Sequence, residues 1–259
     1  MRIILLTQSD RLYLPNSVAT VCRALGSELV AVVSAPALST HGTMFKGIMR
    51  HLRLFGISGT VAIVLRILGS MVRGIFPAPN SGSFTSLQAA CKAYDVPFHT
   101  VQKVNGPEFQ ALIDQYQPEL LVSLSCPQII RKVVRQRFPK GCINVHGAPL
   151  PRYRGLMPAF WSLRYAEPET AVTVHVLDDK LDNGDILGQR TVAISPTDTW
   201  DSLVRKTKAA AAEALIQTIE EIRNGTVVHR PNLEAEATYF SFPTAMDRQA
   251  FLAAGRRFF

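Results

Sequence analysis

The stretch RIILLTQSDRLYLPNSVATVCRALGSELVAVVS, residues 2 to 34, decides the fold of this chain. It begins with RIILLT and ends with LVAVVS, two short apolar runs that are typical of buried parallel strands. Between these runs apolar residues recur at helical spacing, and Gly26 is placed to end the helix. Strand, helix and strand in this order predict the start of an α/β domain.

The same alternation resumes after residue 85 and continues to a long helix at residues 200–224, with Thr199 as its cap and Gly225 as its stop. Other helices are predicted at residues 86–94, 107–116 (capped by Asn105), 127–138 (started by Pro127) and 157–166, and strands at 97–101, 120–125, 141–146, 171–179 and 185–194. We therefore expect an α/β, Rossmann-like, mostly parallel sheet with helices on both faces. Such sheets bind ligands at the carboxyl ends of their strands.

Composition places the chain among globular proteins, because 47% of its 259 residues are hydrophobic and 19% are charged. The net charge of +8 suits an anionic partner: nucleic acid, a phosphorylated small molecule, a polyglutamyl cofactor or a membrane surface. An inert basic surface is the alternative. The four cysteines are scattered without a CxxC pair, which argues against disulfides and zinc, and the start MRIILLTQSD resembles a strand more than a signal peptide. A cytoplasmic location is expected.

Residues 42–82 interrupt the alternation with a segment that is apolar and basic together. Its uncharged run, Leu54 to Leu65, is shorter than a bilayer requires, so no transmembrane segment is expected. One or two amphipathic helices ending in the loop PAPNSGS are predicted. A helical insertion packed on the core or at a homodimer contact is favoured over a peripheral membrane or partner-binding role.

The stretch INVHGAPLPRYRG, residues 143 to 155, carries the first polar cluster. Asn144 and His146 are two residues apart on a predicted strand, so their side chains share one face at its carboxyl end. They could act on a ligand, or they could simply cap the loop that follows.

A second polar cluster is HVLDDKLDNGD, residues 175 to 185. A calcium loop is excluded, because with Gly184 at the turn position Leu181 and Arg190 would occupy ligand positions. An acidic surface hairpin remains the structural alternative. Amide, imidazole and carboxylate groups together suit acyl transfer to an amine. The amide and the imidazolium can donate hydrogen bonds to the oxyanion of the tetrahedral intermediate. The carboxylate can hold the protonation state of the imidazole or take the proton of the amine. There is no G-x-S-x-G nucleophile elbow, which favours direct attack by the amine.

INVHGAPLPRYRG followed by AVTVHVLDDKLDNGDIL resembles the folate-dependent formyltransferase family, in which N-x-H, a leucine-proline loop, a strand and D-x-G follow in order. The resemblance covers about residues 120 to 194. It implies the formyltransferase fold, a catalytic domain over residues 1–230 with residues 231–259 as a short C-terminal extension, and 10-formyltetrahydrofolate as formyl donor with no metal. It also implies that Asn144, His146 and Asp182 are the catalytic residues.

The resemblance places the folate on the segment that follows the expected strand at 120–125 and on the turn before Asp182. It places the acceptor beside the loop 150–155. The implied folate-binding residues are Ser123, Ile129, Ile130, Asp179, Leu181 and Asp182. The implied residues on the acceptor side are Arg152, Arg154, Gly155 and His175, although a solvated basic loop is equally consistent with the two arginines.

Features of this sequence that depart from known members of the family narrow the range of possible acceptors. The first-strand loop TQSDRLYLPNS lacks the glycines of the phosphate loop of glycinamide ribonucleotide formyltransferases. The chain ends about 35 residues after its long helix, too soon for the C-terminal barrel of methionyl-tRNA formyltransferases, and it starts without the regulatory domain of formyltetrahydrofolate hydrolases. We therefore expect an N-formyltransferase for a small amine, by elimination a nucleotide-linked amino sugar, with nucleic acid disfavoured as a partner. Two alternatives stay open: tRNA formylation using the 42–82 insertion, and a non-catalytic membrane- or partner-binding protein.

Overall fold

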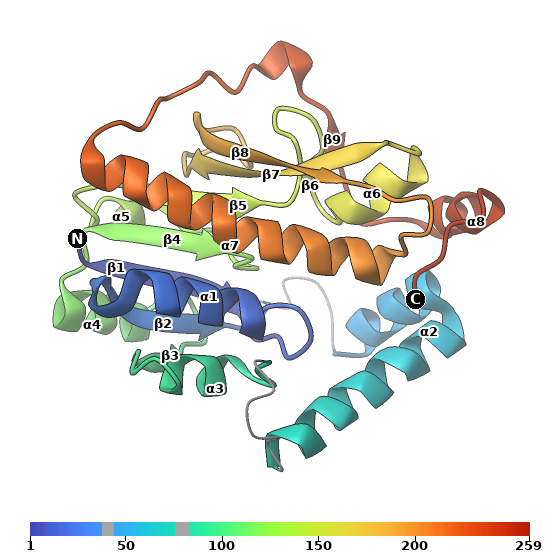
Figure 1. The fold of residues 1–259 in the computed structure, drawn as a ribbon, viewed down its shortest axis with the longest axis horizontal. Coiled ribbons are helices and arrows are strands. Elements are labelled where there is room, and N and C mark those ends of the chain that lie inside the picture. Colours follow the sequence, from blue (N-terminus) through green and yellow to red (C-terminus); the bar gives the residue numbers. More distant parts are fainter. Residues whose placement is uncertain (38–43, 76–82) are drawn as a thin grey trace.

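The computed structural model describes residues 1–37, 44–75 and 83–259 (Figure 1). The strands are β1 (Ile3–Gln8), β2 (Leu29–Ala35), β3 (Phe98–Thr100), β4 (Leu120–Leu124), β5 (Cys142–His146), β6 (Arg154–Gly155), β7 (Glu169–Val176), β8 (Ile186–Ala193) and β9 (Tyr239–Phe240). The helices are α1 (Pro15–Leu25), α2 (Met44–Ile75), α3 (Leu87–Lys92), α4 (Pro107–Tyr116), α5 (Lys132–Arg135), α6 (Pro158–Arg164), α7 (Trp200–Asn224) and α8 (Ala245–Ala253), with short 3₁₀ turns η1 (Gly26–Glu28) and η2 (Glu234–Glu236).

Seven strands form one sheet in the order β3-β2-β1-β4-β5-β7-β8. The first five are parallel, and β7 and β8 add to the edge as antiparallel strands. The predicted mostly parallel α/β sheet is thereby confirmed. The strand order reverses between β1 and β4, which is where such sheets open a crevice at their carboxyl edge.

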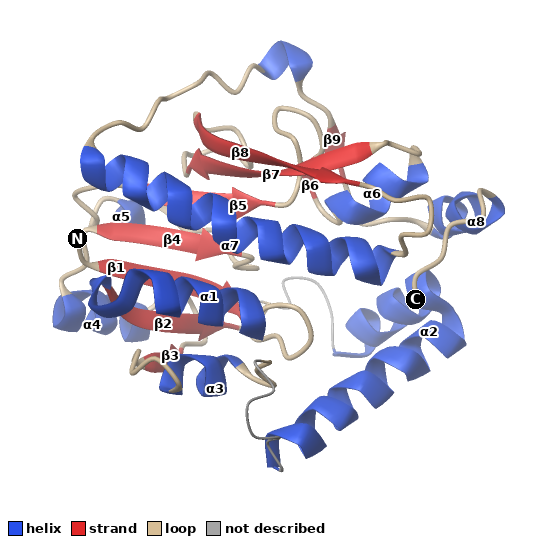
Figure 2. Ribbon diagram, in the orientation of Figure 1, coloured by secondary structure: helices blue, strands red, loops and turns tan. Residues whose placement is uncertain are grey.

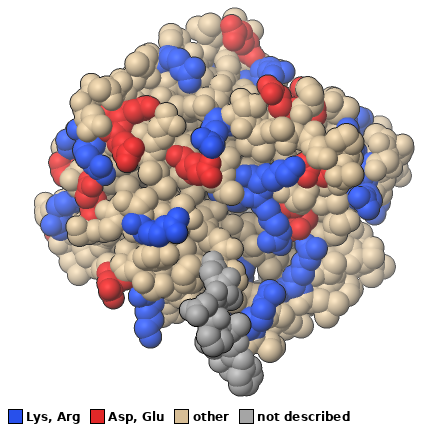
Figure 3. All heavy atoms as spheres, in the orientation of Figure 1, with Lys and Arg blue, Asp and Glu red and all other residues tan. Residues whose placement is uncertain are grey.

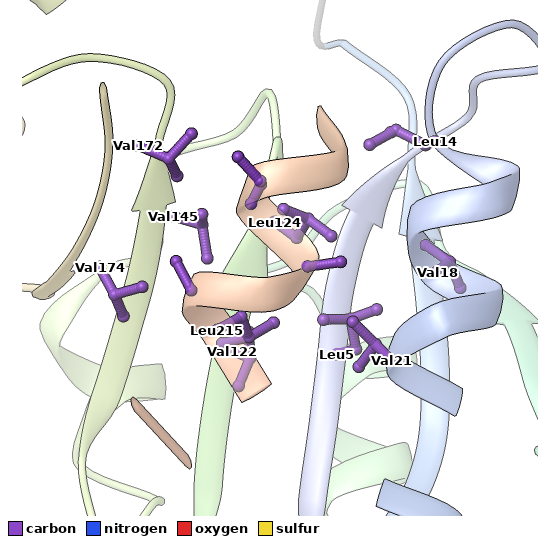
Figure 4. Close-up of a cluster of buried hydrophobic side chains, with 14 of the residues drawn as sticks. Leu5, Leu14, Val18, Val21, Val122, Leu124, Val145, Val172, Val174 and Leu215 are labelled. Carbon is purple, nitrogen blue, oxygen red and sulfur yellow. The ribbon is translucent and has the colours of Figure 1, made fainter. Parts of the chain in front are cut away.

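Helices cover both faces of the sheet, as Figure 2 shows for α1 and α7 on the near side. On that side Leu5 and Val122 of the strands pack with Val18 of α1 and Leu215 of α7 (Figure 4). Alternate residues of the same strands pack on the other face against α4 and α5. Burial on both faces explains why the central strands read as continuous apolar runs.

Two local predictions were wrong. The helix expected from Pro127 is reduced to α5, and Asn105 does not cap α4, which begins after Gly106. The buried side chain of Gln128 explains the first error: its amide donates to the carbonyls of Pro36 (2.7 Å) and Gln102 (2.9 Å). These long-range hydrogen bonds hold the segment after β4 as a loop.

The C-terminal residues fold back onto the sheet domain. β9 pairs with β6, and Phe251 of α8 and Phe258 lie in the same core as the central strands. Phe251 and Phe258 thus attach the segment 231–259 to the main core.

Helix α2 is the predicted helical insertion, and it bends at Gly56, where the backbone takes φ 71°. The loop expected at residues 77–83 lies almost wholly outside the described residues. Within the described chain, Met49–Gly74 forms one segment that is long and apolar enough to cross a membrane by length and composition, with mean hydropathy 1.8 and 17% of its best window buried. This finding differs from the expectation of no transmembrane segment, which was drawn from the length of the uncharged run Leu54 to Leu65 alone.

Candidate active site

The site is built at the carboxyl end of β5, where Asn144 and His146 lie on one face of the strand as their spacing predicts. The antiparallel partner β7 sets His175 opposite Asn144 and Thr173 opposite His146. The turn between β7 and β8 then brings Asp182 against both histidines: its carboxylate lies 3.6 Å from Nδ1 of His146 and 3.7 Å from Nε2 of His175. Residues more than 30 positions apart therefore form one polar cluster.

His175 orients the amide of Asn144. Its Nδ1 lies 2.9 Å from the carbonyl oxygen of Val176, which only accepts, so Nδ1 carries the proton. Burial lowers the pKa of His175 to about 4, and the ring is neutral at pH 7. Its Nε2 is then an acceptor and receives a hydrogen bond from Nδ2 of Asn144 at 3.1 Å. Among residues 1–37, 44–75 and 83–259 this amide nitrogen has no other hydrogen-bond partner, so its second N–H can donate to a ligand.

His146 has a fixed tautomer for the same kind of reason. Its Nε2 donates to the carbonyl oxygen of Tyr153 at 2.8 Å. The other nitrogen, Nδ1, faces the carboxylate of Asp182. Nδ1 is thus the atom at which His146 can gain or lose a proton, next to an acid that can share it.

The turn that carries Asp182 is held in place by backbone conformation and by three hydrogen bonds, two to Asp182 and one to Gly184. Asp182 takes φ +50°, and its Oδ2 accepts from the backbone N–H of Gly155 at 2.9 Å. The side chain of Asn232 donates to the carbonyls of Asp182 (2.9 Å) and Gly184 (3.1 Å). Gly184 is required here, because a Cβ would stand 2.1 Å from the carbonyl oxygen of Val176. The hydrogen bond from Gly155 to Asp182 therefore joins the loop that follows the N-x-H motif to the D-x-G turn.

The two arginines of the loop after β5 have different positions. Arg154 is buried, and its guanidinium donates to Glu234 (2.6 Å) and to both oxygens of Asn232 (3.0 and 3.2 Å). It joins the loop to the C-terminal segment, and this geometry gives no support to an anion contact. Arg152 is exposed and lies 3.5 Å from Glu167. Sequence reasoning missed Asn232, since nothing in its local pattern marks a residue that reaches Asp182 across 50 positions.

The residues implied for folate binding lie on two neighbouring segments, residues 123–130 and 179–182, which we call the two walls. Ser123 and Ile130 are buried, whereas Ile129 is 79% exposed on one wall and Leu181 is 50% exposed on the other. Arg135 joins the walls: it donates to the carbonyl of Ile130 (2.7 Å) and forms an ion pair with Asp179. Sequence reasoning missed Arg135, because residues 127–131 were expected to be helical, whereas they form the loop that presents the carbonyl of Ile130 to this arginine.

A cavity of about 390 Å³ lies at the same carboxyl edge of the sheet, because its lining includes Ser9, the first residue after β1. Met157, two residues beyond Gly155, also lines this cavity, so one short segment of chain contacts both the cavity and Asp182. Its lining is largely aromatic and aliphatic, with Asp10 and Arg11 from the loop after β1. The other lining residues include Tyr13, Phe55, Ile63, Trp200 and Phe242.

The arrangement can stabilise charge and move a proton. A directed amide N–H can donate to an oxygen that becomes negative, and the His146–Asp182 pair can accept a proton from an attacking amine. Within the described residues no group of three or more His, Cys, Asp or Glu is arranged to hold a metal ion.

Comparison with protein families gives one match over most of the chain. A family model described as formyl transferase matches residues 38–219. A methionyl-tRNA formyltransferase of Trichlorobacter lovleyi is 34% identical over 146 residues, which are 56% of this chain and 46% of that protein. The chain thus spans about half the length of this curated relative.

Comparison with solved structures identifies the same fold. An N-formyltransferase from Helicobacter canadensis, solved with folinic acid and dTDP-3-aminofucose, aligns with a TM-score of 0.59 at 15% identity, covering 98% of this chain and 80% of that one. A phosphoribosylglycinamide formyltransferase from Anaplasma phagocytophilum aligns with a TM-score of 0.60 at 14% identity, covering 93% and 98%. At these identities the likeness concerns the fold.

Proposed function

The chain belongs to the formyl transferase family, and on this premise we propose that it transfers a formyl group from 10-formyltetrahydrofolate to the primary amine of a small acceptor. The observation that carries the proposal is the Asn144 amide, turned by neutral His175 and set beside the His146–Asp182 pair. Acyl transfer needs a donor to a developing oxyanion and an acceptor for the amine proton, and the cluster supplies both.

Each residue has one role in this proposal. The free N–H of Asn144 donates to the formyl oxygen as that oxygen gains negative charge. Asp182 takes the proton that the acceptor nitrogen loses when its bond to the formyl carbon forms, either directly or through Nδ1 of His146. The tetrahedral intermediate then collapses: the bond from the formyl carbon to N10 of the folate breaks, and the same proton passes to N10, which gives tetrahydrofolate and the formylated amine. His175 keeps the amide in position. Loss of an oxyanion donor costs about a hundred- to thousandfold in rate, and loss of a proton acceptor about a hundred- to ten-thousandfold.

The two walls beside the cluster suit the folate donor. Ile129 and Leu181 present exposed apolar surface to solvent, which a flat pterin ring could cover, and Arg135 holds both walls at a fixed separation. The donor supplies the formyl group; the chain supplies its orientation.

For the acceptor we propose a nucleotide-linked amino sugar bound in the 390 Å³ cavity. Aromatic rings such as Tyr13, Trp200 and Phe242 can stack on a base or on the apolar face of a sugar ring, and Arg11 can meet a phosphate. The Helicobacter canadensis protein, whose structure was solved with an amino-sugar nucleotide, has the same fold.

A second candidate acceptor is an aminoacyl-tRNA, because a methionyl-tRNA formyltransferase is 34% identical over 146 residues. The basic net charge of +8 agrees with either acceptor. Salt distinguishes them: several phosphate contacts with tRNA give an affinity that falls steeply with salt, whereas a small acceptor gives a shallow dependence.

The test is a mass-spectrometric acceptor screen of purified protein with 10-formyltetrahydrofolate, nucleotide-linked amino sugars, simpler amines and charged initiator tRNA. We expect one nucleotide-linked amino sugar to gain a formyl group as tetrahydrofolate appears. Asp182→Asn should abolish this gain, and Asp185→Asn, an exposed carboxylate of the same turn, should preserve it. Formylation of tRNA alone would transfer the assignment to the second candidate. Failure to bind the folate would contradict the proposal and favour a non-catalytic role.

A further inference from the structure

Helix α2 exposes its apolar residues. Seven large apolar side chains of this helix are between 42% and 79% exposed: Ile57, Val61, Val64, Leu65, Leu68, Met71 and Val72. At 100° per residue these positions fall within an arc of about 120°, so they form one continuous stripe along the helix after its bend. We call this stripe the outer face of α2.

The opposite side of the same helix is attached to the fold through small and polar residues. Ser70 is buried, and its hydroxyl donates to the carbonyl of Thr85 at 3.1 Å. Arg66 forms an ion pair with Asp201 at 2.7 Å. Gly59 lies against the ring of Phe259. Besides these contacts, this side carries the half-buried Ile63 and Ile67, so after the bend the long continuous apolar stripe is the side that faces solvent.

The charge of α2 has one sign. Its sequence carries Lys46, Arg50, Arg53, Arg66 and Arg73 and no acidic residue. Arg53 and Arg73 are exposed. Figure 3 shows mostly uncharged surface where α2 lies in Figure 1, with basic side chains along its border. The outer face therefore has an exposed arginine near each of its ends, Arg53 just before the bend and Arg73 beside Val72, and this arrangement complements a bilayer with anionic headgroups.

We propose that the outer face of α2 docks the enzyme on an anionic phospholipid bilayer, with the helix lying in the plane of the headgroups. A spanning orientation would strip Arg66 and Ser70 of their partners in the fold. Pairing with a second copy through a two-fold axis would bring two α2 helices together, and each is basic and has no acidic residue to compensate the other. Ile63 and Ile67 of the same helix line the cavity beside the catalytic cluster, so docking brings that cavity within about 10 Å, one helix diameter, of the lipid.

The experiment is co-sedimentation of the full chain with vesicles of phosphatidylglycerol and phosphatidylcholine, compared with pure phosphatidylcholine. Wild type should pellet with the anionic vesicles and be released by high salt. Leu65→Gln/Leu68→Gln should weaken binding at least tenfold, since two apolar side chains that the lipid would bury are replaced by polar ones. Arg53→Gln/Arg73→Gln should weaken it by about fivefold per charge. The matched control Val133→Gln/Val228→Gln removes equally exposed apolar residues away from α2 and should bind as wild type does.

Thermal unfolding of each variant checks that the fold is retained. The proposal is overturned if folded wild type stays in the supernatant with anionic vesicles, or if Leu65→Gln/Leu68→Gln binds them unchanged. It is also overturned if wild type resists extraction by salt and alkali, as a spanning helix does. Light scattering that shows a dimer dispersed by Leu65→Gln/Leu68→Gln would assign the face to a second copy instead.

Discussion

The amide nitrogen of Asn144 lies 3.1 Å from Nε2 of His175, and this contact fixes which side of the amide faces the site. His175 is itself locked, since its Nδ1 donates to the carbonyl of Val176. In the proposed mechanism, a histidine that takes no part in proton transfer thereby determines where the oxyanion donor points. The antiparallel register of β5 and β7 makes the contact, because it sets the two residues directly opposite each other.

Replacing His175 should affect the rate more than binding. In His175→Ala the Asn144 amide can rotate, so we expect kcat to fall on the order of tenfold or more with little change in KM for the donor. His175→Gln should restore part of the rate through its side-chain oxygen, and His229→Ala, an exposed histidine, should have no effect. Steady-state kinetics of the three variants decide this; a loss confined to KM would refute the positioning role.

His175 should also make the fold sensitive to acid. Its folded pKa of about 4 lies below the unfolded value near 6.5, so the unfolded chain binds more protons and stability falls as pH drops through this window. Between pH 7 and pH 5 the contribution is about 2 kcal/mol. Urea denaturation of His175→Gln should show a smaller pH dependence than wild type. Equal pH dependence in the two proteins would mean that folding does not lower the pKa of His175.

Gly155→Ala tests the junction between the two motifs. A Cβ at Gly155 would stand 2.2 Å from the carbonyl oxygen of Phe240, and its backbone φ is +97°. We expect destabilisation by about 3 kcal/mol or more and a loss of activity, because the Gly155 N–H holds Asp182. Gly225→Ala is the control: φ is +68° but the space is open, so it should cost about 1 kcal/mol with normal kcat. Similar effects for both variants would show that backbone strain alone is responsible.

Arg135→Ala tests the walls of the proposed folate site. Losing the link between Ile130 and Asp179 should raise KM for the formyl donor by about three- to tenfold and leave kcat nearly unchanged. Arg137 lies just beyond α5 and forms an exposed ion pair with Asp114. Arg137→Ala breaks only this ion pair and should behave as wild type. If KM for the acceptor rises instead, the walls belong to the other substrate.

Local signals predicted much of the fold. Helix α7 has the predicted bounds, because Thr199 caps its first turn with Ser202 and Gly225 takes the left-handed conformation at its end. The shared face of Asn144 and His146 followed from the period of a strand. These features depend on neighbours in the chain, which a sequence displays directly.

The remaining features depend on partners far along the chain. Asn105 was expected to cap α4, but its side chain instead binds the backbone of Ile129 and Arg131. Asn232 reaches Asp182 through the folded-back C-terminal segment. The apolar pattern of α2 indicated a helix, but periodicity alone does not say whether the apolar stripe faces the core or the solvent.

The most direct test of the account is transfer of a carbon-13-labelled formyl group from 10-formyltetrahydrofolate to an amine, followed by mass spectrometry for wild type and Asn144→Ala. The account predicts labelled formamide product with wild type and a rate at least about a hundredfold lower with folded, donor-binding Asn144→Ala. Undiminished transfer by Asn144→Ala would contradict the central claim that this amide stabilises the reacting oxygen.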